Sequence, residues 1–247
     1  MSAVKINALL AEALEAHGGR KRWLRFKGAS ATLLDGGKLL GLKGLEIDSA
    51  QRRRVVSTDF HRQWTQVAPF GDPDYTMTWV PEHVEIRASA GKVVAERDNP
   101  RGSFAGHAFD TPWDMAHFAY FHGYAMWTYF AAPFVFAEPG YQVTDIAPIA
   151  QNGTTLRGIS VRFPDSVHTH TREQRFYFGP DGLLARHDYE VDVWARFPAA
   201  HFLSDYVDVD GLKFPAQRKT YLRYPDGSAD SYFNAVWIVL SDYKLRR

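Results

Sequence analysis

Cysteine is absent from the 247 residues of this chain. Disulfide bonds, thiolate metal sites and a cysteine nucleophile are therefore excluded. No apolar run reaches the length of about 20 residues that a membrane-spanning helix needs. The chain also lacks an excess of charge, with 29 Lys and Arg against 28 Asp and Glu. This balance argues against a nucleic-acid partner, because such proteins usually carry a basic face.

The fingerprints of common cofactor and active sites are missing as well. The sequence contains no G-x-G-x-x-G, P-loop, G-x-S-x-G or H-E-x-x-H pattern, so we expect no cofactor. The first residues do not resemble a signal peptide, because Glu12 and Glu15 interrupt a short apolar stretch. We therefore expect a cytoplasmic location, and a periplasmic one only if a leader has been removed.

The chain is rich in apolar and aromatic residues, which make up 45% and 15% of it. A chain of this length and composition can bury a large core. It contains no internal repeat, low-complexity segment or interdomain linker. We expect residues 1–247 to form a single domain.

Two segments have the pattern of helices. In the first, apolar positions recur at helical spacing before Gly18-Gly19, namely Val4, Leu9, Leu10, Ala13, Leu14 and His17. The second runs from Pro112 to about Ala131, with Thr111 as the expected N-cap and Asp114 in the first turn. It is apolar on nearly every side, so we expect it to be buried or to cover an apolar surface.

The remaining segments have the pattern of antiparallel strands. Short apolar runs alternate with turn signals, for example Asn152-Gly153, Asp210-Gly211 and Asp226-Gly227. Spacing of this kind is typical of β meanders, and we count about 10–12 strands. The sequence therefore predicts a mainly β protein that wraps an apolar interior.

Two stretches carry a family resemblance. Residues 12–23 form a helix end with Gly-Gly followed by Trp23, and residues 206–215 precede a basic strand and Asp226-Gly227. Together they resemble the lipoprotein-carrier superfamily typified by LolA and LolB. The resemblance implies a strongly curved antiparallel half-barrel, with the N-terminal and mid-chain helices plugging its concave apolar face. Residues 113–133 and 168–189 look more like a separate bacterial branch of this fold.

Polar side chains share one face of the mid-chain helix. At about 100° per residue, this face holds Asp114, His117, Tyr120, Phe121, Tyr124 and Thr128. Asp114 and His117 are three residues apart, and a carboxylate that orients an imidazole is the usual arrangement of a general base. The alternative is that Asp114 caps the helix. Tyr120, Tyr124 and Trp127 are expected to line a ligand cavity.

A second polar row is expected on the sheet. If Phe178 pairs with Leu183 across the Gly179–Gly182 turn, one sheet face carries His170, Arg172, Gln174, His187 and Tyr189. His201 and Asp205 could continue this row. Phe176 and Phe178 point to the same face, which favours the interior. We treat this row as the main candidate for binding, with His187 as a candidate catalytic group.

His168 and His170 are two residues apart in an expected strand, so their imidazoles would share a face. Such a pair can bind a divalent metal, and a third ligand would have to come from His187 or Asp205. A chance pair among ten histidines explains the spacing equally simply. We therefore expect no bound metal, and a metal-assisted hydrolase is the less favoured alternative.

Two functions fit these patterns. The first is binding of a hydrophobic small molecule or lipid in an apolar cavity, which matches the composition of ligand pockets. The second is a cofactor-independent acid/base enzyme, such as an isomerase, lyase, cyclase or hydrolase, acting on an apolar substrate there. Either function predicts a pocket between sheet and helix that is contacted by His117 or Tyr124 and by Arg172, His187 or Tyr189.

Overall fold

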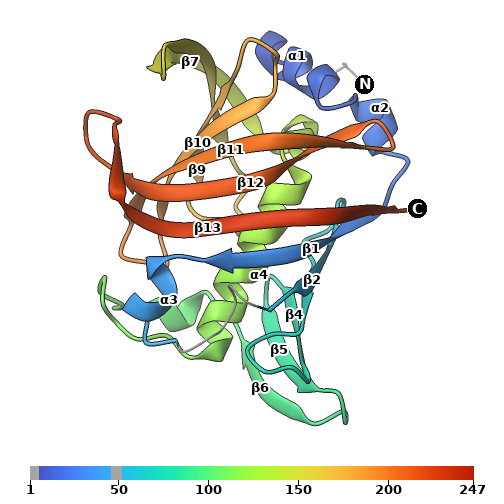
Figure 1. Ribbon diagram of the computed structural model, residues 1–247, viewed down its shortest axis with the longest axis vertical. Coiled ribbons are helices and arrows are strands. Elements are labelled where there is room, and N and C mark those ends of the chain that lie inside the picture. The colour runs from blue at the N-terminus through green and yellow to red at the C-terminus, as the bar shows by residue number, and fades with distance from the viewer. Residues whose placement is uncertain (1–5, 46–51) are drawn as a thin grey trace.

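The computed structural model describes residues 6–45 and 52–247 (Figure 1). The strands are β1 (Gly28–Gly36), β2 (Arg54–Asp59), β3 (Thr65–Ala68), β4 (Tyr75–Val80), β5 (His83–Ala88), β6 (Val93–Asp98), β7 (Gln142–Gln151), β8 (Thr154–Arg162), β9 (Glu173–Phe178), β10 (Leu184–Val191), β11 (Phe197–Val209), β12 (Leu212–Arg223) and β13 (Ala229–Arg246). The helices are α1 (Ala8–Ala16), α2 (Arg20–Trp23), α3 (Lys38–Leu42) and α4 (Met115–Ala131), with 3-10 turns η1 (Gly102–Phe104) and η2 (Phe134–Ala137).

All thirteen strands belong to one antiparallel sheet in the order β6-β5-β4-β3-β2-β1-β13-β12-β11-β10-β9-β8-β7. Two meanders, β1 to β6 and β7 to β13, join where β1 pairs with β13. The sheet is not closed, and β6 and β7 form its two edges. This architecture confirms the predicted half-barrel, with one strand more than the upper number expected.

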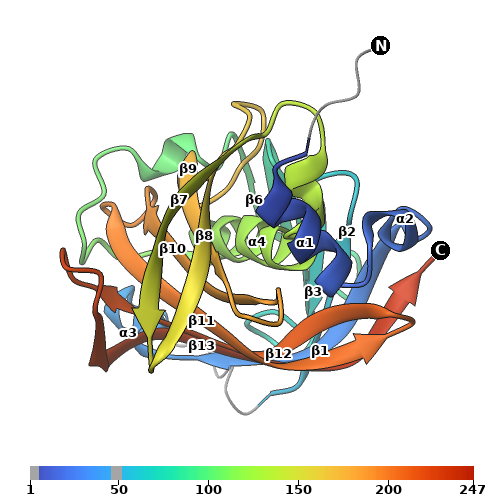
Figure 2. The same cartoon turned by 90° about the horizontal axis from the view of Figure 1, so that it is seen from above.

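The sheet curves around α4, which lies along its concave side (Figure 2). Of the 17 residues in α4, 15 are buried, as the absence of a polar face predicts. The helix ends at Ala131 as expected, but its N-cap is Asp114 and not Thr111. The reason is a capping box: the Asp114 carboxylate accepts the His117 backbone N–H, and the His117 imidazole accepts the Asp114 backbone N–H.

A glycine allows α4 to lie close to the N-terminal meander. A Cβ atom at Gly123 would be 2.3 Å from the Trp79 ring on β4, so any larger residue would push the helix away from the sheet. Beside this contact, the Thr65 hydroxyl on β3 donates a hydrogen bond of 2.9 Å to the Gly123 carbonyl. This close approach fixes the position of the helix and, with it, the side chains that α4 presents to the C-terminal meander.

The N-terminal helix α1 packs against β8 and η2 at one end of the concavity (Figure 1). Leu10 and Leu14 are its buried contacts, and Asn7 caps its first turn. Val4, which the sequence pattern places in this helix, lies outside the described residues. None of the helices in residues 6–45 and 52–247 has the length and hydropathy to span a bilayer.

Candidate functional site

A small cavity lies between α4 and the concave face of the sheet, with a free volume of about 40 Å³. Its walls are almost entirely apolar. They come from α4, from the central strands β10, β12 and β13, from α3 and from the turn after β10, and include Phe121, Met126, Tyr189, Trp194, Phe197 and Ile238. The predicted apolar cavity is therefore present, but in this closed form it is large enough only for a few water molecules.

Polar groups reach the cavity at two places. One is the buried pair of Asp35 and His122, whose carboxylate oxygen and Nε2 lie 3.2 Å apart. The other we call the polar end of the cavity. Tyr129 on α4, Tyr189 on β10 and Thr220 on β12 line it there. The two phenol oxygens are 3.2 Å apart and hydrogen-bonded to each other. The Tyr129 hydroxyl also lies 3.1 Å from Nε2 of His170. The helix, the sheet and the loop before β9 therefore meet at one hydroxyl group.

Behind this end lie three buried histidines, His170, His187 and His201, which we call the histidine cluster. The ring centroid of His187 lies 6.5 Å from that of His170 and 5.7 Å from that of His201. His187 donates from Nε2 to the amide oxygen of Gln174 at 2.6 Å. The Gln174 amide nitrogen in turn donates to Thr169. This chain of hydrogen bonds fixes the tautomer of His187.

Burial controls the protonation of the cluster. Desolvation lowers the pKa of His170 to about 3 and holds the pKa values of His187 and His201 well below the usual value for histidine. All three imidazoles are therefore neutral near pH 7. Both ring nitrogens of His201 find no hydrogen-bond partner among the described residues. An unpaired buried imidazole of this kind calls for a water molecule or a ligand.

The pairing of β9 with β10 differs from the expected register. Phe178 pairs with Leu184, and a bulge between Leu184 and Arg186 places Phe176 opposite His187. Gln174 still reaches His187 through its side chain, so the structure brings these two together as predicted. The bulge shifts the register because it adds one residue to β10 alone.

Arg172 does not join the row. It lies before β9, where its half-exposed side chain pairs with Asp165 on the surface. His168 and His170 are also not in a strand, but in the loop between β8 and β9. This loop turns His170 inward to Tyr129, whereas His168 contacts Tyr120. The expected shared face for the two imidazoles is therefore wrong.

The polar residues expected on α4 divide between two places. The Tyr120 hydroxyl lies 3.0 Å from Nδ1 of His168 and accepts a hydrogen bond from Arg101, which ties the helix to the neighbouring loops. Tyr124 packs edge-on against His170 with ring centroids 5.0 Å apart, so it borders the histidine cluster. Trp127 faces away from the cavity, toward a surface hollow beside Trp23.

Asp114 and His117 form the predicted pair, but at the start of α4 and away from the cavity. The Asp114 carboxylate is half exposed and bound to Arg97 by two hydrogen bonds of 2.6 and 3.2 Å. Nδ1 of His117 lies 2.9 Å from the Asp114 carboxylate and accepts the Asp114 backbone N–H at 3.3 Å, so the predicted contact forms within the capping box of the helix. The geometry therefore matches the capping alternative.

His201 and Arg218 are two further buried residues on the concave face of β11 and β12. His201 lies opposite Thr220 in the β11–β12 pairing, and so continues the row as the sequence suggested, whereas Asp205 is exposed. Arg218, two residues before Thr220, is buried on the same face. Sequence reasoning missed Arg218. The signal was its place in an alternating strand whose other inward positions include Phe214 and Thr220.

One group among the described residues has the spacing of a metal site. The ligand atoms of His83, Glu85 and Glu96 lie within 4.8 Å of one another on the outer face of β5 and β6. The Glu85 carboxylate is already paired with Arg87, whose two nitrogens lie 2.5 and 2.9 Å from it. The group lies outside the cavity, and we assign it no role there.

A curved, open antiparallel sheet that encloses one helix and an apolar cavity defines an open half-barrel. No protein-family model and no curated protein matches the chain. Among solved structures, it is similar to a LolA superfamily protein from Nitrosomonas europaea, with 9% identity over 99% of this chain and 95% of that chain and a TM-score of 0.52. It is also similar to an outer membrane lipoprotein-sorting protein domain from Vibrio parahaemolyticus, with 8% identity, 96% and 90% coverage and a TM-score of 0.51.

At these identities, the likeness shows a LolA-like fold. The expected cytoplasmic location gains no support from these matches, one of which is an outer membrane lipoprotein-sorting protein domain.

Proposed function

We propose that this protein binds a lipid or another hydrophobic small molecule between α4 and the concave face of the sheet. The observation that carries the proposal is the apolar cavity there, which ends at the polar groups of Tyr129, Tyr189 and Thr220. Apolar walls with a few convergent polar groups are typical of ligand sites. One structural neighbour with the same fold is an outer membrane lipoprotein-sorting protein domain, and this role is compatible with a site for an apolar chain.

The cavity must widen to admit a ligand, because ligand pockets usually enclose about 300–1,000 Å³. Its walls include Leu39, Leu40 and Met126. Unbranched methionine changes its conformation readily, and Leu39 and Leu40 come from the short helix α3. We expect the cavity to widen at these side chains when a ligand enters.

The acid/base enzyme is the weaker candidate. A catalytic acid or base works best when its pKa lies near the operating pH. Burial holds the pKa of His170 at about 3 and lowers that of His187 well below the usual value. Both are therefore poor bases near neutral pH.

Titration with the neutral fluorophore Nile red tests the binding proposal. We expect saturable binding, and we expect Ala125→Leu to weaken it about tenfold or more, since Ala125 lines the cavity and a larger side chain would fill it. Ala119→Leu is the matched control on the same helix, because Ala119 is buried outside the cavity walls. Equal effects of the two variants, or no saturable binding by the parent, would contradict the proposal.

A further inference from the structure

Arg218 lies on β12 and points to the concave side of the sheet. It is only 4% exposed. Its Nη2 donates a hydrogen bond of 2.8 Å to the Tyr129 carbonyl, and its guanidinium lies 4.6 Å from the centre of the Tyr129 ring. Tyr129 also lines the cavity. The side chain of Tyr129 therefore separates Arg218 from the cavity in which we propose that the ligand binds.

This charge has no carboxylate partner among the described residues. No Asp or Glu oxygen in that part of the chain lies within the 4.0 Å of an ion pair. The titratable groups around it that can become anionic are four tyrosines, Tyr129, Tyr189, Tyr206 and Tyr243. Burial raises the pKa of each phenol, so all four are neutral near pH 7 and none is a counterion. The Nε of Arg218 is buried without a hydrogen-bond partner. A fully buried arginine is rarely left without a counterion, because removing a cation from water is costly.

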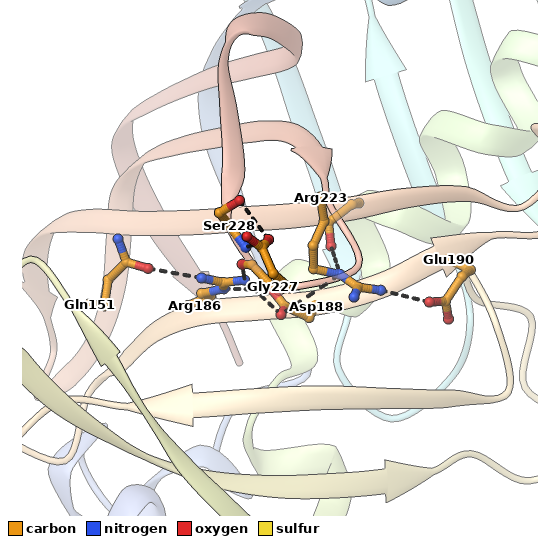
Figure 3. A network of polar contacts seen from close by, with 9 residues as sticks. Gln151, Arg186, Asp188, Glu190, Arg223, Gly227 and Ser228 are labelled. Carbon is orange, nitrogen blue, oxygen red and sulfur yellow. Dashed lines mark hydrogen bonds and ion pairs between the residues drawn. The ribbon is translucent and has the colours of Figure 1, made fainter.

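The other buried arginines show the contrast. Arg54 and Arg186 are as deeply buried as Arg218, and each pairs with a carboxylate. Arg54 pairs with Asp35. Arg186 donates to both oxygens of Asp188 at 2.7 and 2.9 Å, within the larger network in Figure 3. Within the described residues, the chain therefore supplies a counterion for each buried arginine except Arg218.

A second unsatisfied group faces the same place. His201 and Thr220 are directly opposite each other on β11 and β12, and Arg218 is the next inward residue along β12. The His201 ring packs edge-on against Tyr129 with centroids 4.8 Å apart, so the imidazole and the guanidinium contact the same ring. Both His201 nitrogens lack partners in the described part of the chain. One imidazole N–H and the guanidinium Nε–H therefore lie beside the same tyrosine without a hydrogen-bond partner among the described residues.

We propose that Arg218 and His201 bind the anionic head, a carboxylate or a phosphate, of an amphiphile whose apolar tail occupies the cavity. An anion there would neutralise the buried guanidinium and accept hydrogen bonds from both side chains, which is the geometry for which arginine is best suited. The inference rests on the proposed function, since the tail needs the cavity. It adds the chemical class of the ligand: a fatty acid or a phosphate monoester, not a neutral lipid.

The test compares oleate with oleyl alcohol, which has the same tail and no charge. Each is added below the concentration at which it aggregates, and the displacement of Nile red measures its affinity. We expect the parent to bind oleate at least about tenfold more tightly than oleyl alcohol, since a hydrogen bond to a charged group contributes about ten- to a hundredfold in affinity. We expect Arg218→Gln to remove this preference and to leave the affinity for oleyl alcohol unchanged. Lys219→Gln is the matched control, because Lys219 is the adjacent exposed residue with the same charge.

Each outcome distinguishes the two proposals. If oleyl alcohol and oleate bind the parent equally well, the anionic head is wrong and the hydrophobic site stands. If neither binds, the proposed function itself fails. If inorganic phosphate alone displaces Nile red as well as oleate does, the site binds a free anion and the amphiphile is overturned. Should Arg218→Gln fail to fold, the preference of the parent for oleate and its loss in His201→Phe decide the question.

Discussion

The imidazole of His170 lies flat on the phenol ring of Tyr189, with ring centroids 4.1 Å apart and ring planes 13° apart. The Tyr129 hydroxyl contacts both partners of this stack, at 3.1 Å from the imidazole and 3.2 Å from the phenol oxygen. One hydroxyl on α4 therefore holds together a loop histidine and a strand tyrosine that lie 19 residues apart in the sequence (189 − 170). The polar end of the cavity depends on this group.

Replacing Tyr129 with phenylalanine should lower the free energy of unfolding by about 1–3 kcal/mol, because it leaves the buried His170 nitrogen and Tyr189 hydroxyl without their shared partner. Urea unfolding measures the change. Tyr224→Phe is the control: its hydroxyl donates to Asp230 at the surface, and its loss should stay within about 0.5 kcal/mol. Similar losses in the two variants would mean that the buried hydroxyl has no special role.

Stability should fall between pH 7 and pH 5. Burial lowers the pKa values of His17 and His170 to about 4 and 3, and those of His187 and His201 well below the usual value. In this window the unfolded chain binds protons on these histidines and the folded chain does not. Their stabilising contribution is complete above the unfolded pKa of about 6.5 and is lost as the pH falls towards the folded values.

Urea unfolding at a series of pH values measures this effect. Each such histidine contributes a slope of up to about 1.4 kcal/mol per pH unit below its unfolded pKa, and carboxylates change their charge mainly at lower pH. His201→Gln should reduce this slope by about 1.4 kcal/mol per pH unit, the contribution of one proton. Equal stability at pH 7 and pH 5 would show that the cluster is not buried in solution.

Gly123→Ala should destabilise the protein by about 1–3 kcal/mol, as overpacking does. The added methyl group would meet the Trp79 ring at 2.3 Å, and this clash outweighs the gain in helix propensity of about 1 kcal/mol. Gly41→Ala in α3 provides the opposite case, because nothing lies within 4 Å of its Cβ position. Thermal unfolding should show a lower Tm for the first variant and an equal or higher Tm for the second.

Asp114→Ala should lower the free energy of unfolding by about 0.5–2 kcal/mol, as expected for the loss of an N-cap. It should leave Nile red affinity unchanged, because the capping box lies away from the cavity. Asp114→Asn keeps a capping oxygen and loses only the ion pair with Arg97, so its stability should be close to that of the parent. A tenfold loss of binding in either variant would restore Asp114 and His117 as site residues.

The fold could be predicted because its signals are local. Turn residues such as Asn152-Gly153 and Asp210-Gly211 fix where strands end, and both have the expected positive φ angles. The apolar character of residues 115–131 likewise predicts burial without knowledge of any partner. The N-cap was misplaced by three residues because Thr111 and Asp114 both suit a cap, and only the capping box with His117 distinguishes them.

The site could be predicted only in part, because it depends on register. The bulge near Leu184 has no signature in the turn that precedes it, so the residue opposite His187 could not be read from the sequence. The inward turn of His170 comes from a loop, for which alternation gives no rule. Arg218 was hidden for another reason: an arginine within a strand usually faces solvent, and only the complete sheet shows that this one faces the interior.

The pairing of β1 with β13 has a consequence for the order in which the protein forms on the ribosome. Residues 229–246 are translated after every other strand, yet they fill the middle of the sheet. Until they leave the exit tunnel, β1 and β12 each expose an unpaired edge, and such edges attract other chains. Before β13 emerges, the two halves of the sheet are therefore not joined to each other, and the aggregation risk of the nascent chain should peak just before β13 leaves the ribosome.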